Sequence, residues 1–125
     1  MGETTLSGDV AIKYDDGKPS YDLIPPEPLD GLARLFGLGA KKYDDRNWEK
    51  GMGWSRVFAA MMRHAWKWFR GNTYDNQDGQ HHLLSVIWCA MVLYSYEVRG
   101  IGADDRPKPY VFEGDYEAMW REEKS

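Results

Sequence analysis

Cysteine is nearly absent from this chain, which has Cys89 alone among its 125 residues. A single thiol cannot build a framework of internal disulfides, and such sparse use is typical of a reducing compartment. Long apolar runs are absent as well. None reaches the ~20 residues of a membrane-spanning helix, and no apolar signal segment follows Met1. We therefore expect a protein of the cytoplasm without a membrane partner.

The chain also lacks an excess of positive charge. Its 20 Asp and Glu outnumber its 16 Lys and Arg, so the formal net charge is −4. This balance argues against a nucleic-acid polymer as the partner, because proteins that bind such polymers are usually basic. A local group of cations on an acidic chain favours a small anion instead.

Several well-known catalytic motifs are missing. The sequence has no glycine-rich P-loop, no Cys-x-x-Cys pair and no Gly-x-Ser-x-Gly turn. It has no adjacent His-Asp pair either, which histidine–aspartate phosphohydrolases need as bridging metal ligands. These absences argue against each of the corresponding enzyme classes.

The chain does contain three segments with the apolar spacing of helices, near residues 28–43, 56–70 and 80–99. No alternation typical of strands accompanies them, so the expected fold is all-α. Residues 1–22 read as an extended arm, 23–100 as the helical core, and 101–125 as a charged, aromatic tail with a short helix near Tyr116–Glu123. The third segment is apolar almost all round, which predicts a central position or an interface, and we expect a homo-oligomer.

Local signals predict where these helices begin and end. Ser55 is a plausible N-cap of the second helix. Gly71 and Gly100 follow the second and third helices, where glycine commonly adopts the left-handed conformation that ends a helix. Gly37 and Gly39 weaken the first helix, and they indicate either close packing against a neighbour or a kink.

A basic stripe runs along the second helix and consists of Arg56, Ala60, Arg63, Lys67 and Arg70. Spacings of three and four residues place these positions on one helical face. The stripe is either a solvated face or an anion site. The second helix contains no acidic residue that could neutralise it, which favours the anion site. Arg56, Arg63 and Lys67 are therefore candidate phosphate-binding side chains.

A second group of polar residues joins the end of this helix to the start of the next. His64 lies beside the basic stripe, Asp75 and Asp78 lie in the intervening loop, and His82 begins a thin polar seam on the third helix. Buried polar groups need partners, so we expect His64 to contact this seam. The four residues are candidate catalytic groups that could hold a divalent metal. The alternative is a hydrogen-bonded structural cluster in which Asp78 caps the third helix.

Pairs of carboxylates provide a further candidate for Mg²⁺, which usually takes one or two carboxylates together with phosphates and waters. Asp75 and Asp78 form one pair, and Glu27 and Asp30 form another at the start of the first helix. The second pair has a simpler explanation, because acidic residues are favoured in the first turn by the helix dipole. We expect Asp75, Asp78 and Glu27 to be the metal ligands.

The loop between the first two helices combines cations, an amide and two aromatic rings. Asn47 is suited to reading a base edge while Tyr43 or Trp48 stacks on its face. Alternatively, Trp48 anchors the loop to the core. The candidate substrate-binding residues of this loop are Lys41, Lys42, Tyr43, Arg46, Asn47 and Trp48.

Taken together, several of these motifs resemble a family of small bacteriophage proteins, the dATP/dGTP diphosphohydrolase N-terminal domain family. The resemblance covers about residues 13–99. It rests on Lys18-Pro19, Tyr21-Asp22-Leu23-Ile24-Pro25-Pro26, Gly39-Ala40-Lys41-Lys42-Tyr43, Arg46-Asn47-Trp48, Arg63-His64, Trp68, Gly71, Asp75, Asp78-Gly79, His82-Leu83 and Trp88. It implies a nucleotide ligand, a place in the host cytoplasm and a relation to the all-α, MazG-like pyrophosphohydrolases. Those enzymes cleave between the α- and β-phosphates with Mg²⁺ held by helical carboxylates.

The chain departs from the MazG-like group at the metal motifs, because it has no helix with Glu-Glu-x-x-Glu followed by a helix with Glu-x-x-Asp. The resemblance therefore supports nucleotide recognition more firmly than catalysis. We consider three hypotheses. The first is a Mg²⁺-dependent purine deoxynucleoside triphosphate pyrophosphohydrolase, in which His64 or a carboxylate orients the water. The second is a non-catalytic protein that sequesters a nucleotide-derived immune signal, such as a cyclic dinucleotide or an NAD-derived molecule, to counter host defence. The third is a purely structural or protein-binding helical module in which the basic stripe is solvated.

Overall fold

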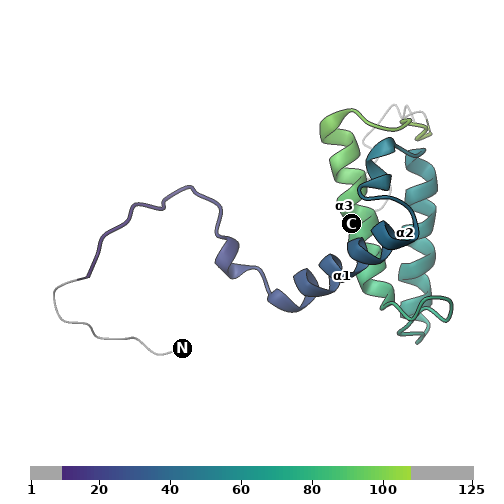
Figure 1. The fold of residues 1–125 in the computed structure, drawn as a ribbon, viewed down its shortest axis with the longest axis horizontal. Helices are drawn as coiled ribbons and strands as arrows, with labels where there is room; N and C mark the ends of the chain where they lie inside the picture. Colours follow the sequence, from purple (N-terminus) through teal and green to yellow (C-terminus); the bar gives the residue numbers. More distant parts are fainter. Residues whose placement is uncertain (1–9, 108–125) are drawn as a thin grey trace, which may run out of the picture.

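The computed structural model describes residues 10–107, and these residues form an all-α fold without a β-strand. Its long helices are α1 (Pro26–Lys42), α2 (Trp54–Phe69) and α3 (His82–Arg99), and two short 3₁₀ helices, η1 (Tyr21–Leu23) and η2 (Asn47–Lys50), precede α1 and α2. In Figure 1, α2 and α3 stand side by side while α1 runs into this pair from the arm. The predicted fold class is confirmed.

The antiparallel pair of α2 and α3 holds the core. Val57 from α2 packs with Cys89, Val92 and Tyr96 from α3, and all four side chains are buried. Helical spacing in both segments places these residues on facing stripes, and burial of their apolar surface stabilises the pair. Helix α3 contacts both α1 and α2, which agrees with the central position predicted for it, and the alternative of an oligomer interface stays a prediction.

The middle and end of α1 pack against α3. Leu32 is buried there, and an added Cβ on Gly31 would lie 2.5 Å from Leu84 Cδ1. Gly31 is therefore the glycine that allows close packing. For Gly37 and Gly39 the alternative of close packing is wrong, since no atom of another element within residues 10–107 lies within 4 Å of a Cβ built on either residue, and the alternative of a kink stays a prediction.

The C-terminal ends of α2 and α3 follow the predicted pattern. Gly71 has a φ of 103°. The N–H groups of Gly71 and Asn72 donate to the carbonyls of Trp68 and Lys67, both at 3.0 Å, which is the Schellman arrangement. Gly100 ends α3 with a φ of 69°.

The N-terminal ends differ from prediction. Gly53 is the N-cap of α2, and Ser55 lies inside the helix, where Asp105 accepts hydrogen bonds from its N–H at 2.8 Å and its hydroxyl at 2.6 Å. A carboxylate from beyond α3 thus satisfies the start of α2, and it opposes the positive end of the helix dipole. At α3 the cap is His81, whose Nδ1 accepts the N–H of Leu83 at 3.0 Å, so the alternative in which Asp78 caps this helix is wrong.

The segment before α1 is exposed from residue 10 to residue 27. It carries large apolar side chains such as Ile12 and Tyr14, which are 77% and 83% exposed. This surface agrees with the expected homo-oligomer, which stays a prediction. No helix within residues 10–107 is long and apolar enough to cross a membrane. The short helix predicted near Tyr116–Glu123 lies outside the described residues.

Candidate functional site

A pocket of about 900 Å³ lies between the C-terminal half of α1, the segment 43–49, the N-terminal part of α2 and the face of α3. We call it the central pocket. Its wall includes the aromatic residues Phe36, Tyr43, Trp48 and Trp88, the arginines Arg46, Arg56, Arg63 and Arg99, and the amide of Asn47. A volume of this size accommodates a small organic molecule such as a nucleotide.

One wall of the central pocket is a continuous aromatic cluster. The ring centroid of Phe36 lies 6.2 Å from that of Trp48 and 5.9 Å from that of Trp88, and Trp48 lies 6.2 Å from the buried Tyr96. The Tyr96 hydroxyl donates to the Trp48 carbonyl at 2.6 Å. Trp48 therefore anchors its loop to the core, as the simpler interpretation proposed, and it also lines the pocket.

The four arginines of the pocket wall fall into two pairs, of which one interacts with Glu49 and the other does not. Arg99 donates to Glu49 at 2.7 Å and lies over the Trp48 ring at 5.4 Å, and Arg46 is 3.9 Å from the same carboxylate. Arg56 and Arg63 form no ion pair with any residue between 10 and 107. These two guanidinium groups are thus available to an anion in the pocket.

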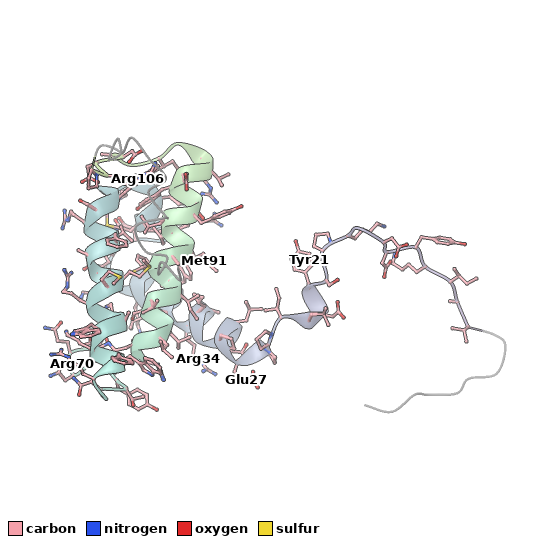
Figure 2. All side chains as sticks on the ribbon, turned by 180° about the vertical axis from the view of Figure 1, so that it is seen from behind. Tyr21, Glu27, Arg34, Arg70, Met91 and Arg106 are labelled. Atoms are coloured by element: carbon pink, nitrogen blue, oxygen red, sulfur yellow. The ribbon has the colours of Figure 1, made fainter. Side chains whose placement is uncertain are left out.

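The structure divides the basic stripe. Arg56, Ala60 and Arg63 line the central pocket, whereas Lys67 and Arg70 do not. Figure 2 shows Arg70 at the far end of α2. The loop is divided as well. Tyr43 to Trp48 contribute to the wall, but Lys41 and Lys42 are exposed outside it.

A second cluster lies at the other end of the helix pair, where α2 ends and α3 begins. Nδ1 of His64 and Nδ1 of His82 are 2.9 Å apart, which confirms the expected contact between them. Asp75 completes a group in which one ligand atom from each residue lies within 4.8 Å of the other two. We call these three residues the His–Asp cluster. His82 is only 2% exposed, and the other two are half-buried.

The loop between α2 and α3 holds Asp75 in this position through its backbone. The N–H of Asp75 donates to the Gln80 carbonyl at 2.8 Å, and the N–H of His82 donates to the Thr73 carbonyl at 3.0 Å. The N–H of Gln77 donates to Asp75 Oδ1 at 2.7 Å. The carboxylate is therefore oriented by a closed hydrogen-bonded loop.

The local environment sets the protonation of two members of the His–Asp cluster. Burial lowers the pKa of His64, and the neighbouring His82 lowers it further. The hydrogen bond from the Gln77 N–H lowers the pKa of Asp75. Near neutral pH the cluster thus contains a neutral His64 imidazole and an ionised Asp75 carboxylate, which are the forms that bind a metal.

Two of the three expected Mg²⁺ ligands do not join this cluster. Asp78 is exposed, and its Oδ1 accepts the N–H of Gln80 at 3.0 Å. Glu27 is exposed on the outer part of α1, away from α2 and α3 (Figure 2). The residues that converge are two imidazoles and one carboxylate, whereas Mg²⁺ prefers oxygen ligands. The convergent set therefore does not fit the Mg²⁺ site that the resemblance implied.

Sequence reasoning missed several residues of the central pocket, among them Arg99, Phe36 and Trp88. Arg99 lies in the last turn of α3, where a cation is explained by the helix dipole, and nothing local connects it with a loop 50 residues earlier. Phe36 and Trp88 are predicted as apolar helix positions, and Trp88 also belongs to the family resemblance, but neither is predicted as a pocket residue. Their spacing indicates burial, but it does not distinguish a core from a pocket wall.

Comparisons with known proteins agree with the resemblance stated above. A sequence model of the family described as dATP/dGTP diphosphohydrolase, N-terminal, matches residues 10–106. A protein of Salmonella phage PMBT28 named dATP/dGTP diphosphohydrolase is 35% identical over 84 residues, which cover 62% of this chain and 29% of the phage protein. The chain thus spans less than a third of that relative's length. No solved structure matches. Because the family model covers most of the sequence, the chain belongs to the dATP/dGTP diphosphohydrolase N-terminal family.

Proposed function

We propose that the central pocket binds a purine deoxynucleoside triphosphate, with the base against the aromatic wall and the phosphates toward Arg56 and Arg63. The observation that carries this proposal is the meeting of these two arginines, which form no ion pair within residues 10–107, with Phe36, Trp48 and Trp88 around one pocket of about 900 Å³. Stacking of a base on an aromatic ring contributes ~1–3 kcal/mol, and a hydrogen bond to a charged group ~1.5–3 kcal/mol.

The proposed reaction is hydrolysis between the α- and β-phosphates, which gives a nucleoside monophosphate and pyrophosphate. Family membership and the name of the Salmonella phage relative support it. Arg56 and Arg63 would neutralise charge on the phosphates during the reaction. Cys89 lines the pocket, and His82 lies seven residues before it on α3, about 10 Å along the helix. A triphosphate extending from the pocket along α3 points toward the His–Asp cluster.

A non-catalytic binding protein is the second candidate, and one observation favours it. Glu49, a carboxylate in the pocket wall, is held by Arg99 at 2.7 Å, and the Glu-Glu-x-x-Glu motif of MazG-like enzymes is absent. Such a protein would sequester a cyclic dinucleotide or an NAD-derived signal in the same pocket. It would require no metal and no hydrolysis.

Calorimetry with each of the four deoxynucleoside triphosphates tests the binding proposal. We expect dATP or dGTP to bind with a Kd below ~10 μM. Arg63→Ala should raise that Kd by about 10- to 150-fold, the equivalent of one charged hydrogen bond. Arg70→Ala is the matched control, because it removes the same charge from the same helix outside the pocket, and we expect less than a twofold effect. Equal effects of the two substitutions would contradict the assignment of the pocket.

A pyrophosphate-release assay then separates the two candidates. Protein that binds dATP or dGTP should release pyrophosphate from it in the presence of Mg²⁺ or Mn²⁺. If no pyrophosphate forms with either ion, the hydrolase proposal fails. Tight binding of a cyclic dinucleotide or an NAD-derived molecule by the same protein would then establish the sequestering role.

A further inference from the structure

The His–Asp cluster brings together three metal-binding side chains that lie far apart in the sequence. His64 comes from the last turns of α2, Asp75 from the connecting loop, and His82 from the first residue of α3. Two atoms bound at ~2.1 Å to one octahedral or tetrahedral ion lie about 3.0–3.4 Å apart. The two histidine Nδ1 atoms are 2.9 Å apart, and one ligand atom from each of the three residues lies within 4.8 Å of the other two. Side-chain rotations that shift each atom by about 1 Å would close the site.

The donor set determines which ion suits the cluster. Two imidazole nitrogens and one carboxylate oxygen match the borderline divalent transition metals, whereas Mg²⁺ takes oxygen ligands almost exclusively. Three protein ligands on one side also leave positions open for water or a phosphate oxygen.

The surroundings of the cluster support a prepared site. His82 is almost fully buried, and its backbone N–H is fixed by Thr73, so its imidazole has little freedom. Asp75 is fixed by Gln77 on one side, while its carboxylate belongs to the group formed with both histidines. The two Nδ1 atoms face each other at 2.9 Å, so a hydrogen atom lies between them, and a metal ion would take its place.

We propose that His64, Asp75 and His82 form a binding site for a divalent transition-metal ion such as Mn²⁺, Co²⁺ or Zn²⁺, in preference to Mg²⁺. This site is separate from the central pocket, and it does not require that the pocket bind a nucleotide. Arg63, which lines the pocket, directly precedes His64 in the sequence, but none of the three residues of the cluster lines the pocket.

The test uses full-length protein without a polyhistidine tag, treated with EDTA and dialysed, in the absence of nucleotide. Calorimetry with MnCl₂, CoCl₂, ZnCl₂ and MgCl₂ measures affinity and stoichiometry, and the visible spectrum of bound Co²⁺ reports nitrogen and oxygen ligands directly. We expect one transition-metal ion per chain and affinity for Mg²⁺ at least ~100-fold weaker.

Variants identify the ligands. Removing a group that merely orients a metal ligand costs ~10–100-fold in affinity, so Asp75→Asn and His64→Gln should each cost ~100-fold or more. Asp78→Asn is the matched control, because it neutralises a carboxylate of the same loop outside the cluster. Both variants alter half-exposed side chains rather than the buried His82, and circular dichroism verifies that each remains helical.

Three results would overturn the proposal: no ion binds at 100-fold excess over protein, Mg²⁺ binds as tightly as Co²⁺, or Asp78→Asn weakens Co²⁺ binding as much as Asp75→Asn. In each case the two histidines form a hydrogen-bonded structural pair. Because nucleotide is absent from every measurement, a failure here is distinct from a failure of the central pocket to bind nucleotide.

Discussion

Removal of the Tyr96 hydroxyl tests how the loop before α2 is attached to the core. Tyr96 is fully buried, and its hydroxyl donates to the Trp48 carbonyl at 2.6 Å. Trp48 in turn lines the central pocket and contacts Phe36. Tyr96→Phe deletes one oxygen atom, keeps the ring and leaves the shape of the core unchanged.

The expected loss of stability depends on the two hydrogen bonds that the Trp48 carbonyl accepts. A typical buried hydrogen bond contributes ~0.5–1.5 kcal/mol, and leaving one partner wholly unsatisfied costs ~1–3 kcal/mol. The Trp48 carbonyl also accepts the N–H of Gly51 at 3.1 Å, so it keeps one bond after the substitution. We therefore expect a loss near 1–1.5 kcal/mol in the free energy of unfolding, or about 4–10 °C in Tm.

Urea unfolding followed by circular dichroism measures this loss, with Tyr94→Phe as the control. Tyr94 lies on the same helix, is 71% exposed and donates no hydrogen bond to any residue from 10 to 107. Its substitution should change the free energy of unfolding by less than ~0.5 kcal/mol. If the two variants unfold at the same urea concentration, the hydroxyl does not hold the loop and the reasoning above is refuted.

Two further predictions concern a close backbone contact after α3 and the buried thiol of α3. Gly102 has a φ of 80°, and an added Cβ would collide with the Met52 carbonyl oxygen, so Gly102→Ala should destabilise the protein by about 2–3 kcal/mol in urea unfolding. Gly100→Ala is the control, because Gly100 shares the positive φ but has no atom of another segment within residues 10–107 closer than 4 Å to the added Cβ. An equal loss of stability in both variants would show that the collision contributes nothing. Burial raises the pKa of the Cys89 thiol to about 11, so an aromatic disulfide reagent at pH 8 should label the native protein far more slowly than the urea-unfolded protein, and equally rapid labelling would contradict the buried position.

Local sequence determined where the helices form and where α2 and α3 end. The spacing of apolar residues in each segment repeats with the period of a helix, and this period does not depend on distant contacts. Gly71 and Gly100 end α2 and α3 where predicted, because the left-handed conformation is a property of the residue itself. The same locality explains why the basic stripe on α2 was recognised, since one helical face is defined within the helix.

Only the tertiary structure decided which of these residues act together. Asp105 accepts hydrogen bonds from Ser55 in the first turn of α2, and Arg99 donates to Glu49 in the loop before α2, in each case across 50 residues of sequence. The antiparallel pairing of α2 and α3 divides the stripe, so that Arg63 faces the central pocket while its neighbour His64 meets His82. Contacts of this kind depend on how helices pack, and that packing is set by the summed burial of the whole core rather than by any local signal.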